Sequence, residues 1–508
     1  MHRPRYALRL SCPVALALTT IVFAACGNSQ DSGSDTSAGS GGTGRATSSA
    51  GGSMGAGGAV AGSGGAAAGG SSGTGGAAAG GATGGGGRGG AIGTGGADSG
   101  GVTGGQTCGG GTAMNGDITV NLSDLHQRIS GFGASTAWGS TMSAADAATL
   151  WSTTTGAGLS LHRIRIDYTN GHTSELNIAK MAVSYGVTVW ATPWTPPGAD
   201  KTGCSGTNCS VEGTLSNPQA YATFLVGFIN YMKGQGVPIY AVSAQNEPDA
   251  KVTYESCVYT PATMASWVGG TMGPMLSSTG VKIMSPETQN WCGFPGFETA
   301  VLNDANAKMY TSIIATHEYG CSPKAYPEIA QAGKEFWETE IYDTVNTTPD
   351  TGMGSALRIA KLIHDAMTIA SMNAWHFWWV YPASADNGAL WDFTTKQATK
   401  RLWVEGNYAR FVRPGFMRVG TTGMVPSGVL VSAYTNPADG TVAVVAINNN
   451  TSTTALSLFL SGAAPCSLTP WVTSSTDTLA AKTVASIASS RVSITLGAQS
   501  VTTLVGKP

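Results

Sequence analysis

The stretch VPIYAVSAQNEPD, residues 237–249, has the pattern of a buried β-strand that ends in an amide and a carboxylate. Its first seven residues are mostly apolar and include β-branched side chains, as is typical of a buried strand. Asn246 and Glu247 then end the run, and Pro248 begins a turn. Burying a carboxylate costs free energy unless the group is paired. The stretch therefore predicts a strand whose end carries a carboxylate with a function.

Seven other segments share this pattern of a short apolar run with polar residues at its end. They are residues 128–135, 160–167, 187–194, 281–287, 312–320, 334–340 and 373–381. Segments with apolar residues at helical spacing lie between them, such as 218–236 and 355–372. Eight strand–helix units over about 280 residues predict an α/β fold of the (β/α)8 TIM-barrel type. We therefore expect the polar strand ends to meet at the mouth of the barrel.

The pattern changes after Val412, where short alternating segments are separated by turn residues. They are residues 428–435, 441–448, 456–462, 492–497 and 500–506. Such a series predicts a small antiparallel β-sandwich. The segment NGDITVNL, residues 115–122, precedes the barrel and is expected to add a strand to this side domain. We therefore assign 112–412 to the catalytic barrel with its N-terminal strand, and 413–508 to the fused C-terminal β-sandwich.

The N-terminus has the pattern of a bacterial export signal. A basic start, MHRPRYALR, precedes a short apolar run that ends in FAAC at Cys26, so residues 1–26 predict a lipoprotein signal peptide. Ordinary secretion, with Cys26 incidental, is the alternative. Residues 27–111 are rich in Gly, Ala and Ser and predict a disordered linker. We expect a monomeric extracellular or outer-membrane-anchored lipoprotein that contacts the membrane only through a lipid on Cys26.

Seven cysteines lie beyond Cys26, and export makes them candidates for disulfides. Cys204 and Cys209 are expected to close a small loop. Two of Cys257, Cys292 and Cys321 are expected to pair with each other. Because seven is odd, at least one cysteine stays free or pairs between chains.

The formal net charge of −2 argues against a nucleic-acid partner and suits a neutral polymer as substrate. The spacing of cysteines and histidines fits no zinc site, and no phosphate-binding glycine loop stands between a strand and a helix. We therefore expect no metal ion and no organic cofactor.

Two carboxylates end strands that should face each other across the barrel mouth. Glu247 ends the fourth predicted strand and Glu340 ends the seventh. Paired carboxylates suit glycoside hydrolysis, in which one protonates the leaving oxygen and the other attacks the sugar; a retaining enzyme places them about 5–5.5 Å apart. Glu338 competes with Glu340, but it is two residues earlier and should lie deeper. Glu287 and Glu318 also end strands, with neighbours that indicate structural or subsite roles.

Other polar residues are expected around this pair. Asn246 is expected to form a hydrogen bond with a sugar 2-hydroxyl. His317 and Tyr319 are expected to form hydrogen bonds with the nucleophile or with a sugar hydroxyl. Either Arg163 or Arg165 is expected to hold the nucleophile ionised, because an adjacent positive charge lowers the pKa of a carboxyl group. Strand alternation puts both arginines on one face, so the pattern does not choose between them. Arg165 is also a candidate to contact the substrate.

Aromatic residues at the strand ends are candidates to stack on sugar rings, which have an apolar face. Five tryptophans have this placement: Trp138, Trp194, Trp291, Trp378 and Trp379. Trp190 and Trp375 lie within predicted strands, and we expect them in the core.

The motifs together resemble glycoside hydrolase family 30. These motifs are GFGAS, PWTPPG, SAQNEPD, HEYG, FWETE, AWHFWW and RFVRPGFMRV, from about Asn115 to the C-terminus. RFVRPG followed by a β-sandwich resembles the bacterial xylanase branch of that family. The resemblance implies a retaining double displacement with Glu247 as acid/base and Glu340 as nucleophile. It also implies contacts to the sugar from Trp138, Asn246, Trp291 and Tyr319.

One motif departs from the glucuronoxylan-specific members of the family, which carry a pair of arginines after the last strand. This chain reads WWVYPASADNG, with Pro382 and Ala383 at those places. The expected activity is therefore that of an endo-β-1,4-xylanase that does not require glucuronate. The alternatives are a β-1,6-galactanase, β-1,6-glucanase or β-glucosidase-type enzyme of the same family, or a non-catalytic carbohydrate-binding module.

Overall fold

The structure is a computed structural model that describes residues 108–170, 172–345 and 348–508. The predicted signal peptide over 1–26 and, apart from 108–111, the predicted linker over 27–111 lie outside the described residues. The export and lipidation of this chain therefore stay predictions. Within the described ranges, no helix is long and apolar enough to cross a bilayer.

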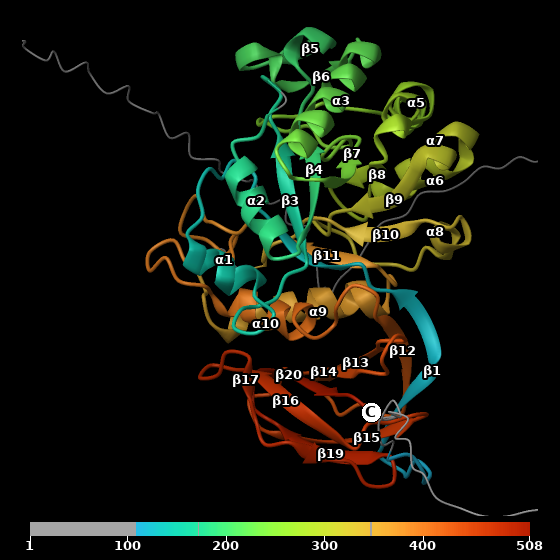
Figure 1. Ribbon diagram of the computed structural model, residues 1–508, viewed down its shortest axis with the longest axis vertical. Helices are drawn as coiled ribbons and strands as arrows, with labels where there is room; N and C mark the ends of the chain where they lie inside the picture. Colours follow the sequence, from blue (N-terminus) through green and yellow to red (C-terminus); the bar gives the residue numbers. More distant parts are fainter. Residues whose placement is uncertain (1–107, 171, 346–347) are drawn as a thin grey trace, which may run out of the picture. The chain divides into compact units, whose positions relative to one another are not determined.

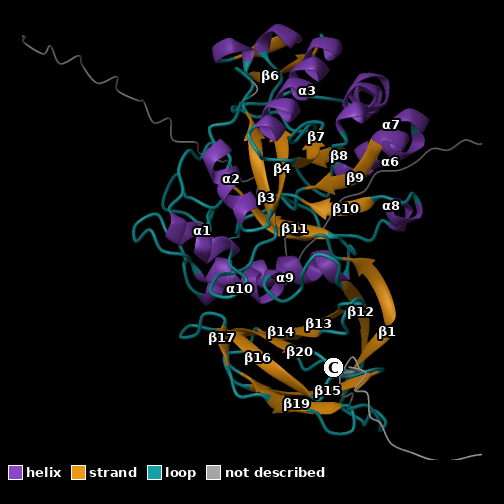
Figure 2. Ribbon diagram, viewed as in Figure 1, coloured by secondary structure: helices purple, strands orange, loops and turns teal. Residues whose placement is uncertain are grey.

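Eight parallel strands close into a barrel, which confirms the predicted (β/α)8 fold (Figures 1 and 2). Closure comes from the pairing of the last strand with the first, where Ala374 lies opposite Gly131. Each of the eight predicted strand segments contains one barrel strand. In barrel order they are β2 (Gly131–Ser135), β3 (Leu161–Ile166), β4 (Thr188–Pro193), β7 (Ile239–Ser243), β8 (Lys282–Thr288), β9 (Thr311–Thr316), β10 (Glu335–Glu338) and β11 (Ala374–Phe377).

Helices follow the barrel strands and cover their outer face (Figure 1). They are α1 (Ala144–Trp151), α2 (Leu176–Ser184), α3 (Pro218–Gly234), α4 (Pro261–Trp267), α5 (Gly273–Leu276), α6 (Phe294–Asn303), α7 (Ala305–Tyr310), α8 (Pro327–Gln331), α9 (Met353–Thr368) and α10 (Lys400–Ala409). The two predicted helical segments are confirmed as α3 and α9. Helix α3 begins where Asn217 caps the backbone N–H of Ala220, with Pro218 in the first turn, as helix starts favour.

Side chains fill the lower interior of the barrel and leave the chemistry to its mouth. Leu161, Trp190, Met284 and Trp337 pack there with alanines from neighbouring strands. Trp190 also donates from Nε1 to His376 at 3.0 Å. Trp375 is likewise fully buried, so both tryptophans expected in the core are there.

Ten other strands form the side domain, a ten-stranded sheet system with its own apolar core. They are β1 (Ile118–Arg128), β12 (Met417–Thr422), β13 (Val429–Thr435), β14 (Val442–Asn448), β15 (Thr454–Ser461), β16 (Ser467–Thr473), β17 (Ala480–Ala481), β18 (Ala485–Ser486), β19 (Arg491–Leu496) and β20 (Ser500–Gly506). All five segments predicted beyond Val412 are strands. The predicted N-terminal strand also joins this domain, since β1 pairs with β12.

The side domain differs from the sequence prediction in its strand direction and in its number of strands. Strand β1 runs parallel to β15, so the domain is not purely antiparallel. Strands β12, β16, β17 and β18 were not predicted. In β16, Pro470 interrupts the apolar pattern, and proline argues against a central strand. Strand β16 nevertheless pairs with β20 over five residues, with Pro470 opposite Leu504.

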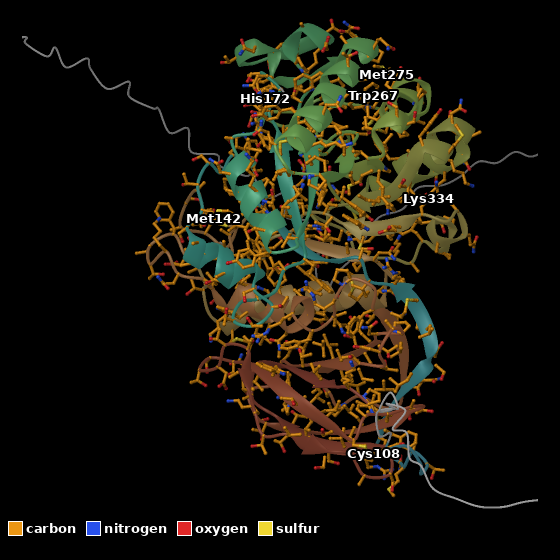
Figure 3. All side chains as sticks on the ribbon, viewed as in Figure 1. Cys108, Met142, His172, Trp267, Met275 and Lys334 are labelled. Carbon is orange, nitrogen blue, oxygen red and sulfur yellow. A yellow bond between two sulfur atoms is a disulfide. The ribbon has the colours of Figure 1, made fainter. Side chains whose placement is uncertain are left out.

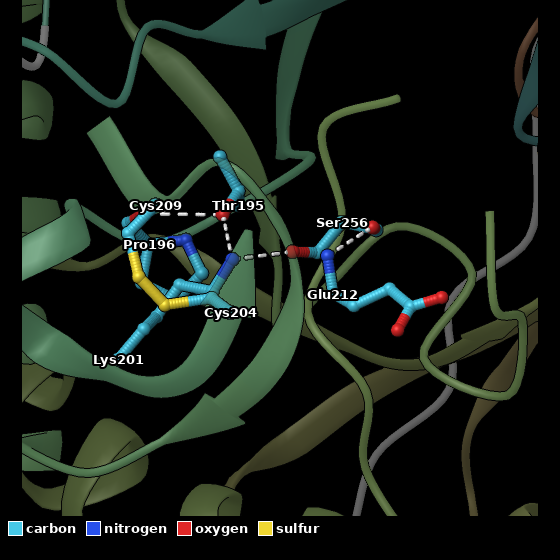
Figure 4. The surroundings of a disulfide bond; sticks show 7 residues. All are labelled: Thr195, Pro196, Lys201, Cys204, Cys209, Glu212 and Ser256. Carbon is cyan, nitrogen blue, oxygen red and sulfur yellow. Dashed lines mark hydrogen bonds between the residues drawn. A yellow bond between two sulfur atoms is a disulfide. The ribbon is translucent and has the colours of Figure 1, made fainter. Parts of the chain in front are cut away.

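A hairpin is inserted between β4 and α3 and carries one of the disulfides. Its strands, β5 (Lys201–Ser205) and β6 (Val211–Leu215), pair antiparallel, and the Cys204–Cys209 bond closes the loop between them as predicted (Figure 4).

Two other disulfides lie elsewhere in the described part of the chain. Cys292 pairs with Cys321, which confirms that two of three candidates pair, and Cys257 is the free, buried cysteine of that trio. The third bond, Cys108–Cys466, was not predicted; it ties the first described residue to the side domain (Figure 3).

Replacing Cys466 by Ser is expected to lower the free energy of unfolding by about 2–4 kcal/mol. The Cys108–Cys466 bond joins residues 358 apart and so restricts the unfolded chain. Chemical denaturation followed by tryptophan fluorescence checks this loss of stability. The Cys108→Ser single variant and the double variant should lose the same amount. Denaturation midpoints equal to that of the wild type would contradict the expectation.

Candidate active site

Glu247 and Glu340 come together at the mouth of the barrel, as predicted. They follow β7 and β10, the fourth and seventh barrel strands, and each is about 5% exposed or less. One oxygen of each carboxylate and one ring nitrogen of His317 lie within 4.8 Å of one another. The two carboxyl groups are thus as close as the pair in retaining glycosidases, which stand about 5–5.5 Å apart, and closer than the pair in inverting enzymes, which stand about 6.5–9.5 Å apart.

The backbone at Glu247 is held in an unusual conformation. Its φ is 46°, in the left-handed region that non-glycine residues rarely adopt. Two hydrogen bonds fix it there: the N–H of Glu247 donates to the carbonyl of Glu287 at 2.9 Å, and that of Asn246 donates to Pro193 at 3.0 Å. Such strain persists where the surroundings over-determine it and clusters at active sites. Here it directs the carboxylate at the end of β7 into the barrel mouth.

Arg163, on β3, is the arginine that binds the predicted nucleophile. Its guanidinium is fully buried and donates to Glu340 Oε2, to Asn246 Oδ1 at 2.7 Å and to Glu287 Oε1 at 3.0 Å. Because Asn246 accepts this bond through Oδ1, its amide NH2 is left as the donor for a ligand. Of Arg163 and Arg165, between which the sequence did not choose, Arg163 is therefore the one that binds Glu340.

Arg165 lies two residues farther along the same face and has a different partner. It donates twice to Glu255, from Nε at 2.8 Å and from Nη2 at 2.7 Å. Its guanidinium also lies 5.3 Å from the ring centre of Trp138. Arg165 therefore stands at the rim of the barrel mouth, and a contact with substrate remains a prediction for it.

His317, which follows β9, stands between three carboxylates. Its Nδ1 lies 3.2 Å from Glu247 and 3.8 Å from Glu340, and its Nε2 lies 3.5 Å from Glu287. Burial alone would lower the pKa of His317, but the charge on Glu340 and bonds to the other two carboxylates raise it to about 10. The ring is therefore a cation at neutral pH; Nδ1 donates to Glu247, and Nε2 faces the carboxylate of Glu287.

The carboxylates respond differently to this environment. Burial raises the pKa of Glu340, and the charges on His317 and Arg163 limit that rise. Burial acts in the same direction on Glu287, but Arg163, His317 and Ser243 together outweigh it, and the pKa of Glu287 falls below its usual value. Tyr319, from the HEYG motif, donates to Glu340 Oε1 at 3.0 Å. Glu340 thus accepts bonds at both oxygens.

Glu338 and Glu318 lie behind the site rather than in it. Glu338 is fully buried and accepts from the backbone N–H of Glu340 at 2.6 Å and of His376 at 2.7 Å. Glu318 accepts from Trp375 Nε1 at 3.3 Å, and burial raises its pKa to about 8. Both carboxylates therefore support the strand ends, and Glu338 is deeper than Glu340, as expected.

Four of the five candidate tryptophans form an aromatic cluster at the mouth. Trp138 is 40% exposed, and its ring centre lies 5.0 Å from that of Trp194, 6.3 Å from Trp378 and 6.4 Å from Trp379. Trp194 is buried beneath the other rings, and the Arg163 guanidinium packs 4.6 Å from its centre. The exposed rings offer apolar faces next to the carboxylate pair, as sugar stacking requires.

Trp291 does not join this cluster. It is 3% exposed and packs among the rings of Phe294, Tyr326 and Phe336. Its position after β8 has the sequence pattern of the other candidates, but the local fold turns the ring into the core. This placement favours a packing role over the predicted contact with the sugar.

Two residues of the site were missed by the sequence analysis. Tyr254 donates from Oη to Glu247 Oε2 at 2.5 Å, and Glu255 binds Arg165. Both lie in the loop between β7 and α4, which shows no periodicity. The only available signal was their position, seven and eight residues after Glu247.

Comparison with known proteins agrees with this geometry. The family model for the glycosyl hydrolase family 30 TIM-barrel domain matches residues 164–380, and the model for the family 30 β-sandwich domain matches 415–504. The glucuronoxylanase XynC of Bacillus subtilis (strain 168) is 31% identical over 403 residues, covering 77% of this chain and 91% of that protein.

Two solved structures are similar over the same region. The family 30 subfamily 8 xylanase Xyn30A from Clostridium acetobutylicum superposes with a TM-score of 0.70 at 36% identity and covers 78% of this chain and 100% of its own. A family 30 endoxylanase from Clostridium papyrosolvens C71 gives a TM-score of 0.68 at 32% identity, covering 77% and 100%. With both domain models matched in order, this chain belongs to glycosyl hydrolase family 30 and is a glycoside hydrolase.

Proposed function

We propose that the protein is a retaining endo-β-1,4-xylanase that does not require glucuronate on its substrate. The observation that carries the proposal is the buried pair Glu247 and Glu340, bound by two cations within one cluster. The similarity to family 30 xylanases supports xylan as the polymer. Glu340 acts as the nucleophile and Glu247 as the acid/base.

Charge balance in the cluster supports this division of roles. Arg163 and His317 supply two positive charges, and Glu247, Glu287 and Glu340 supply three carboxyl groups. Since buried charges need partners, one carboxyl group should carry a proton in the resting enzyme. Arg163 binds Glu287 and Glu340 directly, which favours their ionised forms. Glu340, bound by both Arg163 and Tyr319, is therefore the nucleophile, and Glu247 is the general acid.

The reaction follows from these positions in two steps. In the first, Glu340 attacks the anomeric carbon while Glu247 gives its proton to the leaving oxygen, forming a covalent glycosyl–enzyme. Tyr319 and Arg163 hold the attacking carboxylate in line. In the second, Glu247 takes a proton from water, the water attacks the same carbon, and the sugar leaves with its original configuration.

The segment after β11 supports the lack of a glucuronate requirement. Residues 382–387 read PASADN, with Pro382 and Ala383 where glucuronoxylan-specific relatives are expected to have arginines. The charged residue of this segment is Asp386, and its negative charge is felt at Tyr342 beside the site. A carboxylate branch on the substrate gains no attraction from Asp386.

Replacing Glu340 by Gln is expected to reduce xylan hydrolysis about 10⁴-fold or more while the protein stays folded, since the nucleophile is lost. Glu247→Ala is expected to lose about 10²–10⁴-fold on xylan, but less on an aryl xylobioside, whose leaving group needs little protonation. Initial rates on both substrates check this. Glu335→Gln is the matched control, because Glu335 lies at the opposite end of β10 and binds Ser130 and Lys282.

Hydrolysis of a polysaccharide panel tests the substrate. Linear or arabinose-substituted xylan should give xylo-oligosaccharides at rates similar to those on glucuronoxylan, with products that do not depend on the glucuronate branches. Products from glucuronoxylan alone would contradict the absence of a glucuronate requirement. Products only from β-1,6-galactan or β-1,6-glucan would replace xylan as the substrate. Binding without products from any polymer would indicate a non-catalytic module.

A further inference from the structure

The loop that follows Glu247 brings a tyrosine back onto its carboxylate. Tyr254 is partly buried, and its hydroxyl lies 2.5 Å from Glu247 Oε2. Burial and the adjacent charge of Glu247 raise the pKa of Tyr254, so the phenol keeps its proton at any pH at which the enzyme works. Tyr254 therefore always has a hydroxyl proton to donate to Glu247 Oε2 when that oxygen is ionised.

The inserted β5–β6 hairpin holds this loop from one side. The N–H of Ser256 donates to Ser210 at 3.0 Å, and the N–H of Val258 donates to Gly213 at 2.9 Å. The Ser256 hydroxyl accepts from the N–H of Glu212 at 2.9 Å, and Val211 forms a β-bridge with Glu255. The residue after Tyr254 is thus bonded to the hairpin that Cys204–Cys209 closes.

Lys201, which is buried, and Arg165 at the rim hold the loop at two further points. Lys201 Nζ donates to the carbonyl of Ser256 at 2.7 Å and to Thr195 Oγ1 at 2.8 Å, which links the loop to the end of β4 (Figure 4). On the cleft side, Glu255 accepts two bonds from Arg165. Tyr254 therefore stands on a loop fixed from both sides, next to the proposed acid/base.

The partners of Glu247 differ at its two oxygens. Oε1 faces Nδ1 of the His317 cation, and Oε2 faces the Tyr254 hydroxyl. Because a ring N–H already points at Oε1, the proton that Glu247 transfers belongs on Oε2. Other titratable groups near Glu247 come from its own loop and from the ends of β8, β9 and β10: Asp249, Glu287, Tyr319, Glu340 and Tyr342.

We propose that Tyr254 is a positioning residue that orients Glu247 Oε2 and sets the upper pH limit of activity. The disulfide-closed β5–β6 hairpin holds the loop that carries it. This inference rests on the proposed function, since it takes Glu247 as the acid/base. When Glu247 is ionised, the phenol donates to Oε2. When Oε2 carries the proton, the phenol oxygen accepts from it until the leaving oxygen takes its place.

Replacing Tyr254 by Phe should move the basic limb of the kcat/KM profile on xylan upward by about one pH unit. The lost bond stabilised the ionised carboxylate, so without it the carboxyl group keeps its proton to higher pH. At the optimum, kcat/KM on xylan should fall about tenfold, because the acid is less well oriented. On an aryl xylobioside, whose leaving group needs little acid, it should fall much less. The acidic limb should stay in place.

Tyr259→Phe is the matched control, because it removes a buried hydroxyl beside Cys257 in the same loop and should leave both limbs unchanged. The Cys204→Ser/Cys209→Ser double variant loosens the hairpin and leaves the phenol present. It should move the basic limb in the same direction by a smaller amount. If Tyr254→Phe does not fold, as judged by thermal unfolding, this double variant carries the test.

The outcomes distinguish the positioning role of Tyr254 from the assignment of Glu247 as the acid/base. A basic limb that Tyr254→Phe leaves in place, or equal losses on xylan and the aryl substrate, would overturn the positioning role. An unchanged limb in the cysteine double variant would overturn the role of the hairpin. Wild type and Glu247→Ala are measured alongside, since full activity of Glu247→Ala on xylan would instead overturn the proposed function.

Discussion

The active site depends on the buried guanidinium of Arg163. One side chain on β3 binds the carboxylates that follow β10 and end β8, and the amide that follows β7. Burying such a charge is costly, and removing one partner of a buried pair typically costs about 3–5 kcal/mol because the other is left uncompensated. The fork of donors in arginine matches several carboxylates at once, which the single ammonium of lysine does not. Arg163 of β3 therefore fixes the positions of polar groups at β7, β8 and β10 relative to one another.

The charges around the three carboxyl groups explain how the site is prepared for proton transfer. Arg163 and the His317 cation face three carboxyl groups, so the cluster favours one proton among them. A proton held by the electrostatics of the resting site is ready to be transferred to a leaving oxygen. The packed interior below, with Trp190 and Trp337, gives the cluster a rigid and apolar floor. The aromatic cluster packs beside Arg163 through Trp194, and Trp138 exposes 40% of its surface at the barrel mouth.

The barrel strands could be predicted from the sequence because they are buried on both faces and end in polar residues. That pattern placed Glu247 and Glu340 on the fourth and seventh strands and separated Glu340 from the deeper Glu338. It did not choose between Arg163 and Arg165, since alternation gives both the same face. The choice depends on height above the barrel floor, which follows from how the strands pair.

Other features depend on tertiary contacts that no local pattern encodes. Trp291 has the sequence position of a sugar-binding residue, yet its ring packs in the core against Phe294 of α6, Tyr326 just before α8 and Phe336 of β10. Strand β16 forms despite Pro470 because β20 supplies its pairing. Tyr254 reaches Glu247 only because a hairpin inserted some forty residues earlier in the chain holds its loop.

Trapping the covalent intermediate tests the central claim most directly. The full chain would be incubated with an activated 2-deoxy-2-fluoro-xylobioside, which slows the second step more than the first, and then digested and fragmented by mass spectrometry. We expect one added glycosyl unit per chain, carried by Glu340 of the FWETE segment. A label on Glu338 or Glu247, or inverted products with no covalent adduct, would contradict it.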